Sequence, residues 1–166
     1  MRKLLLSVFC AFVALASFGE TKSIGGPDGK LQLSVTVHNG KAMYFVAYDG
    51  NSVLRSSPLG FVASMGDFST DLKLVKAETS SQHIDYTMDR SKQSHVVKDA
   101  NILVVTFENS QQRQFDVRFC VSNNDIAFRY EIGRVPDKTY EQKTSIRIMS
   151  EKTGFRFLEN TRTFLS

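Results

Sequence analysis

The fold is decided by residues 113–132, which read RQFDVRFCVSNNDIAFRYEI. Apolar side chains recur there at every second position on both sides of the Asn-Asn step: Phe115, Val117, Phe119 and Val121, then Ile126, Phe128, Tyr130 and Ile132. A repeat of two places alternate side chains on opposite faces of a strand. The stretch therefore predicts two strands that each have one apolar face.

The Asn-Asn step at positions 123 and 124 predicts a tight turn, because Asn tolerates a positive φ angle. A two-residue turn would pair Phe119 with Phe128 across the hairpin, and Val117 with Tyr130. It would also place Arg118 opposite Arg129, which is unfavourable for two like charges. The diagonal pairs Asp116–Arg129 and Arg118–Glu131 could compensate for that repulsion.

The rest of the chain continues the pattern of short strands and turns. Asn39-Gly40 and Asp49-Gly50 are hairpin signals that flank an apolar run, 43–48, which we expect to be buried on both faces. The other predicted strands are 30–38, 53–54, a short strand ending at 63, 72–77, a weaker one at 82–88 after a break at 79–81, 101–108, 144–149 and 155–157. Turns or loops are predicted at 57–60, 89–93, 109–112, 133–142 and 151–154. No segment after residue 19 has a sustained 3.6-residue apolar period, so the chain is all-β, an antiparallel sandwich or a barrel.

The N-terminus has the features of a secretory signal peptide over residues 1–19. Arg2 and Lys3 precede an uncharged stretch, Leu4–Phe18, and small residues at Ser17 and Gly19 fit a cut before Glu20. The apolar core is shorter than the roughly 20 residues that a membrane span needs. We therefore expect an exported protein, periplasmic or extracellular, without a membrane anchor after cleavage.

Cleavage would leave residues 20–166, which is the length of one ordinary domain. Lys plus Arg falls from 21 to 19 against 17 Asp plus Glu, so the formal charge falls from +4 to +2. The remaining charges are scattered, and this argues against a nucleic-acid partner. Cys120 is the one cysteine left, so no intrachain disulfide is expected, and its place in an alternating strand predicts a buried structural thiol.

The ionisable residues show no spacing that marks a catalytic or metal site. The acidic candidates for paired acid/base chemistry are Asp85, Asp89, Asp116, Asp125, Glu131, Glu141 and Glu151, and no two are singled out. His38, His83 and His95 lack the close spacing of zinc ligands, and Asp49-Gly50-Asn51 lacks the later acidic ligands of a calcium loop. With 13 Phe, 5 Tyr and no Trp, the aromatic residues favour a core over a sugar platform. We therefore assign no catalytic, cofactor-binding or metal-binding residue in this chain.

Several motifs in order resemble the N-terminal domain of glycoside hydrolase family 97, over roughly residues 24–166. They are Pro27-Asp28-Gly29-Lys30-Leu31, Ser57-Pro58-Leu59-Gly60, Tyr86-Thr87-Met88-Asp89-Arg90-x-Lys92-x-Ser94, Asn101-x-Leu103, the stretch from Arg113 to Tyr130, and Glu151-x-Thr153-Gly154-Phe155-x-Phe157. The resemblance implies a large galactose-mutarotase-like β-sandwich that is incomplete at the C-terminus. The chain departs from the family at a shortened segment around 84–86 and at Gly133, where relatives often carry Pro.

The resemblance also implies a role within a larger exported enzyme. Members of the family are α-glucosidases or α-galactosidases that join this sandwich to a (β/α)₈ catalytic barrel, which carries the acid, the base or nucleophile, and most calcium ligands. A glutamate of the N-terminal domain also reaches the calcium, but it lies beyond the point that matches Ser166, so no residue here inherits that role. The apolar end, Thr163–Ser166, likewise suggests a chain cut inside a sandwich.

Two functional hypotheses follow. In the first, the chain is the accessory N-terminal domain of a family 97 enzyme, with the barrel of the same polypeptide and a carbohydrate as its partners, and calcium in the parent enzyme only. In the second, it is a free-standing exported sandwich that binds a glycan or a protein. The missing Trp and the apolar C-terminus favour the first.

Overall fold

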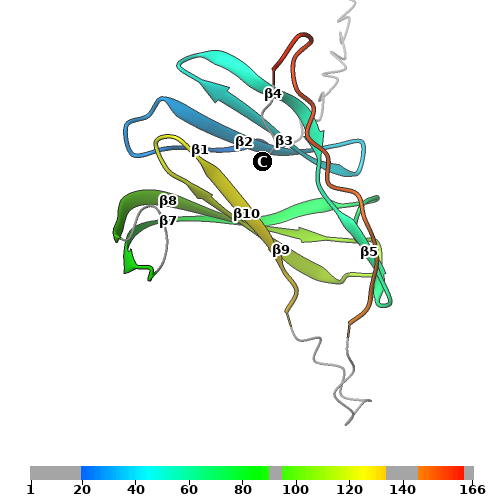
Figure 1. The fold of residues 1–166 in the computed structure, drawn as a ribbon. Coiled ribbons are helices and arrows are strands. Elements are labelled where there is room, and N and C mark those ends of the chain that lie inside the picture. The colour runs from blue at the N-terminus through cyan, green and yellow to red at the C-terminus, as the bar shows by residue number, and fades with distance from the viewer. Residues whose placement is uncertain (1–19, 90–94, 134–145, 163–166) are drawn as a thin grey trace, which may run out of the picture.

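The computed structural model describes residues 20–89, 95–133 and 146–162, and all regular structure in these ranges is β-strand. The first sheet has four antiparallel strands in sequence order: β1 (Lys22–Gly25), β2 (Leu31–His38), β3 (Lys41–Tyr48) and β4 (Asn51–Pro58). The second has the order β10 (Ile126–Glu131), β9 (Gln114–Val121), β8 (His95–Glu108) and β7 (Lys73–Thr87). A small third sheet joins β11 (Ile148–Glu151), β5 (Phe61–Ala63) and β6 (Gly66–Asp67). Figure 1 shows the two larger sheets as layers, which confirms the predicted all-β sandwich.

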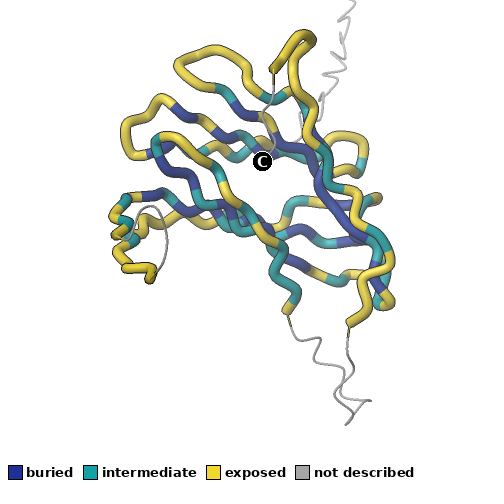
Figure 2. The backbone as a smooth tube through the Cα atoms, viewed as in Figure 1, coloured by how far each residue is buried: buried dark blue, intermediate teal, exposed yellow. Residues whose placement is uncertain are grey.

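The core lies between these layers, and both contribute to it. Its largest fully buried side chains are Tyr44, Phe68, Phe107, Phe115, Phe119, Leu33, Leu59, Leu103, Val35, Val105 and Val117. Figure 2 shows buried backbone on the facing parts of the sheets and exposed backbone along the outer loops. No helix in the described ranges is long and apolar enough to cross a membrane.

The two predicted hairpins of the first sheet are confirmed. Asn39 and Gly40 have φ angles of 49° and 71°, and Asp49 and Gly50 have 49° and 77°. Positive φ at both central residues is the geometry of a type I′ turn, which matches the twist of the flanking strands. The Asp49 turn is therefore a hairpin connection.

The β9–β10 hairpin has the predicted register and the predicted tight turn at 123–124, but other charge partners. Phe119 lies opposite Phe128 and Arg118 opposite Arg129. Positions 123 and 124 are not among the residues with positive φ, and the Ser122 hydroxyl caps the turn by accepting from the amides of Asn124 and Asp125. The proposed diagonals do not form the recorded contacts: Arg129 binds Glu131 on its own strand, at 2.7 Å from Nε to Oε1, and Asp116 accepts a 2.6 Å bond from Thr106.

The predicted break at 79–81 is wrong, because β7 is continuous over 15 residues. The adjacent β8 is 14 residues long and provides a ladder partner for each of these positions, including Leu103 for Thr79 and Asn101 for Ser81. Polar side chains are tolerated there because β7 is an edge strand and most of its residues are exposed. Backbone pairing therefore overrides the local polar signal.

Two other local predictions need correction. In β3, Ala42, Met43, Tyr44 and Val46 are buried. Phe45 is exposed because it points to the face opposite that of Tyr44 and Val46, and Tyr48 at the end of the strand is exposed as well. The expected turn at 151–154 is extended backbone: the amide of Lys152 donates to Gly60 O, and that of Gly154 donates to Pro58 O. The strand expected at 144–149 is observed as β11, Ile148–Glu151.

Some predictions lie outside the described residues. They are the signal peptide at 1–19, most of the loop at 89–93, most of the loop at 133–142 together with Glu141, the start of the 144–149 strand, and the apolar end at 163–166.

Candidate functional site

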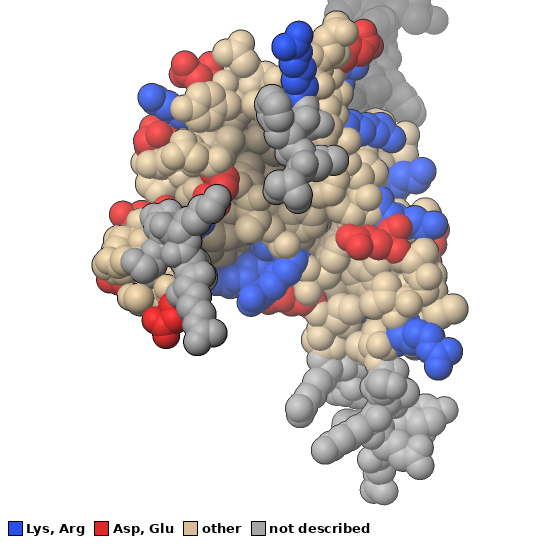
Figure 3. All heavy atoms as spheres, in the orientation of Figure 1, with Lys and Arg blue, Asp and Glu red and all other residues tan. Residues whose placement is uncertain are grey.

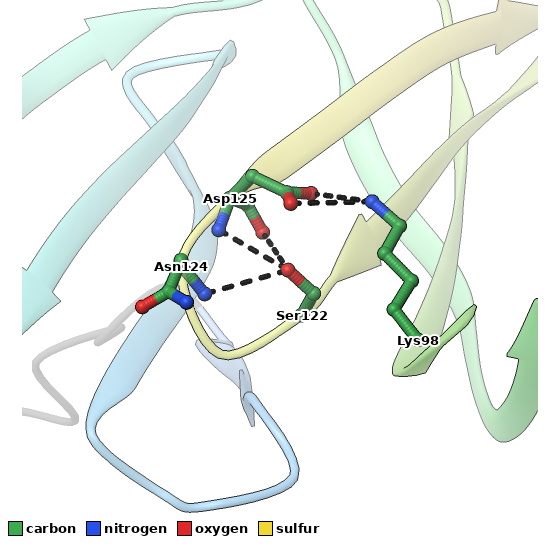
Figure 4. Close-up of polar contacts among 4 residues, drawn as sticks. All are labelled: Lys98, Ser122, Asn124 and Asp125. Carbon is green, nitrogen blue, oxygen red and sulfur yellow. Dashed lines mark hydrogen bonds and ion pairs between the residues drawn. The ribbon is translucent and has the colours of Figure 1, made fainter. Parts of the chain in front are cut away.

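A polar cluster closes the β9–β10 hairpin at one end of the sandwich (Figure 4). Ser122 is 4% exposed, and its backbone amide donates to Asp125 O at 3.0 Å. Its hydroxyl oxygen accepts from the amides of Asn124 and Asp125 at 3.4 and 3.2 Å. Lys98 Nζ lies 3.1 and 3.2 Å from the two carboxylate oxygens of Asp125. The backbone of Asp125 thus belongs to the turn, while its carboxylate, one of the acidic candidates, pairs with Lys98 of β8.

The same turn also ties the two sheets together. The amide of Asp28, in the β1–β2 connection, donates to Asn123 Oδ1 at 3.0 Å, and Asn101 Nδ2 donates to Gly25 O at 2.9 Å. Gly26 lies so close to the turn that an added Cβ would sit 2.3 Å from Ser122 O. This end of the molecule is a structural closure, and its contacts leave no free acid and base facing each other.

Two His–Asp pairs lie on the exposed outer half of the β7–β8 ribbon. His83 Nδ1 lies 2.7 Å from Asp99 Oδ1, and His95 Nε2 lies 2.8 Å from Asp85 Oδ1. The hydrogen bond to Asp99, followed by the charge of Asp99, raises the pKa of His83. All four side chains are more than half exposed, so these pairs contribute little to stability.

The other predicted candidates do not come together. Asp116 and Glu131 are held by Thr106 and Arg129, Asp89 and Glu151 are exposed, and His38 contacts its neighbour Asn39. The expected burial of Cys120 is wrong: the thiol is half-buried, because it shares the outer face of β9 with Gln114, Asp116 and Arg118.

The described residues also do not fit a calcium site. In the described ranges, no three His, Cys, Asp or Glu side chains are placed so that they could hold a metal ion. Calcium in a larger parent enzyme stays a prediction about other parts of that enzyme.

A hydroxyl network that the sequence did not indicate holds the segment 152–157 against the sandwich. Tyr130 Oη lies 2.5 Å from Thr153 Oγ1 and accepts from the amide of Gly60 at 2.9 Å, while Tyr44 Oη donates to Gly154 O at 3.1 Å. The fully buried Ser57 hydroxyl accepts from the Arg156 amide at 2.9 Å. The sequence feature that could have indicated this network is the tyrosines at apolar strand positions, since a buried Tyr hydroxyl usually has a hydrogen-bond partner.

A tyrosine with an ordinary pKa is already protonated at neutral pH, and burial moves the pKa of both tyrosines of this network further above it. Burial raises the pKa of Tyr44 to about 12, and it also raises the pKa of Tyr130. Both phenols therefore remain hydrogen-bonding groups at neutral pH, which suits an anchoring role.

This anchored segment presents an apolar strip to solvent. The strip consists of large apolar residues that are 37–63% exposed: Ile146, Ile148, Met149, Phe155, Phe157 and Leu158. It follows β11 and the chain beyond it, drawn in orange and red in Figure 1 and exposed in Figure 2. Single exposed apolar residues are ordinary, but six of them within 13 residues of extended chain are a candidate interaction surface. The strip is the best candidate for a functional site among the described residues.

Comparison with known proteins agrees with the observed fold and identifies a family to which the chain is similar. The model of the glycosyl-hydrolase 97 N-terminal family matches residues 24–166. Comparison with curated proteins gives no match.

Solved structures contain the same fold within longer chains. A β-arabinopyranosidase is 40% identical, with a TM-score of 0.76 over 83% of this chain and 21% of that chain. A glycoside hydrolase family 97 enzyme from Pseudoalteromonas sp. strain K8, bound to panose, is 23% identical, with a TM-score of 0.72 over 83% of this chain and 20% of that chain. The chain thus spans about a fifth of the length of these structures. It belongs to the glycosyl-hydrolase 97 N-terminal domain family.

Proposed function

We propose that this sandwich is the accessory N-terminal domain of a larger family 97 glycoside hydrolase, and that it supports a (β/α)₈ catalytic barrel on the same polypeptide. Family membership and the one-fifth coverage of the matched enzymes support this role. The domain does not catalyse hydrolysis by itself in this proposal. Hydrolysis of a glycoside needs two carboxyl groups held across one bond, and the described carboxylates are bound to structural partners or exposed singly.

The observation that carries the proposal is the apolar strip. A sandwich that functioned alone in water would gain nothing from six large apolar side chains exposed along one segment. The backbone of that segment is held rigidly by Lys152, Gly154 and Arg156, so its side chains are presented in a defined arrangement. We propose that the strip packs against the catalytic part of the parent enzyme.

The proposed substrates are α-galactosides or α-glucosides. The 40% identical structure is a β-arabinopyranosidase. A β-L-arabinopyranoside has the ring configuration of an α-D-galactopyranoside without its hydroxymethyl group. That similarity favours galactoside-like substrates over glucosides for the parent enzyme.

Turnover of aryl α-glucosides, α-galactosides and β-L-arabinopyranosides tests the proposal, with this chain assayed beside the product of the extended reading frame. We expect turnover by the longer protein only. Activity in this chain alone, abolished by changing one of its own carboxylates, would overturn the accessory role. A stop codon directly after Ser166 would contradict the larger enzyme.

Polar substitutions in the strip test the packing. Met149→Ser and Phe157→Ser should lower the thermal stability of the longer protein and change that of this chain little, because both side chains are exposed here. Arg147→Ser, in the same segment and also exposed, is the matched control and should affect neither. Equal effects of the two serine substitutions on both proteins would mean that nothing covers the strip.

Export is a separate part of the proposal. The charged start, short apolar core and small residues at Ser17 and Gly19 support cleavage before Glu20 and a periplasmic or extracellular location. N-terminal sequencing of secreted protein should begin at Glu20. A mature protein that retains Leu4–Phe18 would contradict this part alone.

A further inference from the structure

β10 is an edge strand of the described sheet, and its protection consists of its short length and the charges of Arg129 and Glu131. In the described ranges its ladder partner is β9 alone. The opposite edge, β7, carries a bulge between Leu74 and Lys76, and bulges and lysines both hinder pairing with another strand. β10 reads IAFRYE, without bulge, Pro or Lys. Its outer backbone groups are therefore available for one more strand.

The outward side chains at this edge are arranged unfavourably within one chain. Arg129 lies directly opposite Arg118, and Glu131 lies directly opposite Asp116. Like charges opposite each other destabilise an antiparallel pair. The side chain of Arg129 turns along its own strand to Glu131, at 2.6 Å from Nη2 to Oε1, and this leaves Arg118 opposite another cation. The outer face of the hairpin thus has one doubly basic row and one doubly acidic row.

A second copy of the chain supplies the complementary order. In an antiparallel pair of β10 strands with Tyr130 on the two-fold axis, Arg129 lies opposite Glu131 of the second copy, and the reverse pair forms by symmetry. Across the four strands, each row of outward side chains then reads Arg118 and Arg129 of one copy, followed by Glu131 and Asp116 of the other. On the inner face, Phe128 lies opposite Ile132 of the second copy, so apolar meets apolar. Centring the axis on Arg129 or Glu131 would instead place that residue opposite itself.

We propose that the chain forms a two-fold dimer by antiparallel pairing of its β10 edges, with Tyr130 at the axis. The pairing spans Phe128–Ile132 of each copy and joins two four-stranded sheets into one. A ladder this short gives a weak, concentration-dependent dimer, and its opposite charges make it weaker at high salt. The proposal rests on the edge and its charges, and is independent of the barrel contact proposed for the strip.

Charge reversal gives a test that separates this dimer from non-specific association. Arg129→Glu places Glu opposite Glu131 of the second copy, and Glu131→Arg places Arg opposite Arg129 of the second copy. Each variant alone should weaken dimerisation by at least about tenfold in sedimentation equilibrium, since two attractive pairs become repulsive. An equimolar mixture of the two should dimerise again, because both cross-copy pairs then have opposite signs.

Folding is controlled within the same experiment. Arg129→Glu faces Arg118 and Glu131→Arg faces Asp116, so each reversal gains an opposite-charge pair across its own hairpin while it loses the exposed Arg129–Glu131 ion pair. Lys76→Glu on the opposite edge of the sheet is the matched charge change and should leave the dimer unaffected. A wild-type chain that remains monomeric at high concentration, a dimer that ignores both reversals, or a mixture that stays monomeric would each overturn the proposal.

Discussion

β9 and β10 have the same alternating apolar pattern and are joined by one short turn, but the two strands lie in different environments. The apolar residues of β9 are at most 1% exposed, whereas Ile126, Phe128 and Tyr130 of β10 are only partly buried. β9 lies between β8 and β10 and is covered by the first sheet, while in the described ranges β10 pairs with β9 alone. The same alternating pattern therefore predicts an apolar face on both strands, and the position of each strand in the sheet decides how deeply that face is buried.

Truncation in the inner strand should have the largest effect. Phe119 is fully buried and packs on Tyr44 and Phe128 at ring-centroid distances of 6.4 and 5.5 Å. Phe119→Ala should lower the free energy of unfolding by about 3–5 kcal/mol, measured by chemical denaturation. Gln114→Ala, on the exposed face of the same strand, is the control and should cost little. Similar midpoints for the two variants would mean that the faces are assigned wrongly.

The matching truncation in the edge strand should cost less. Phe128 lies directly opposite Phe119 and also contacts Phe155, which is 58% exposed. Since Phe128 is already partly in water, Phe128→Ala should cost about 2 kcal/mol in the same assay. A cost equal to that of Phe119→Ala would break the comparison, because it would show that the edge is as well covered as the centre.

Removing one hydroxyl from the edge strand tests what anchors it. Tyr130→Phe keeps the ring but takes the acceptor from the Gly60 amide and the partner from Thr153. We expect a loss of about 1–2 kcal/mol, because polar groups in a partly buried place lose their partner. Tyr48→Phe, at an exposed tyrosine, should be neutral. Should Tyr130→Phe be neutral too, the network does not hold the segment 152–157.

The smallest effect is expected on the exposed outer half of the β7–β8 ribbon, away from the core. The pKa of His83 is raised in the folded chain by Asp99, so its contribution is full below the ordinary histidine pKa and is lost as pH rises through the raised value. His83→Gln should therefore remove a small gain in the unfolding midpoint that wild type shows towards acidic pH. His38→Gln serves as control, because His38 contacts Asn39 and no carboxylate. A gain at alkaline pH instead would reverse the assigned sign.

Local patterns predicted those elements whose structure depends on near neighbours. Asn-Gly and Asp-Gly predicted both type I′ turns, because a turn needs only residues that accept positive φ. Alternation predicted β2, β9 and β10 and the Phe119–Phe128 register. The prediction of a break in β7 failed because ladder partners 20–24 residues away, on β8, stabilise Thr79–Ser81 as a strand. The Asn-Asn step predicted the tight turn and its register, but not the Ser122 hydroxyl that accepts from the amides of Asn124 and Asp125.

By itself, the sequence determined the all-β class, the apolar faces of the central strands, the hairpin turns and the family resemblance, because periodicity and turn chemistry act over a few residues. Only the tertiary structure decided which strand became an edge, that Tyr44, Tyr130 and Ser57 would anchor the segment 152–157, and that the apolar strip would face water. Those outcomes depend on contacts between residues as far as 110 positions apart, such as Tyr44 and Gly154. No local pattern specifies such pairs, since they form only when the two sheets pack around a shared core.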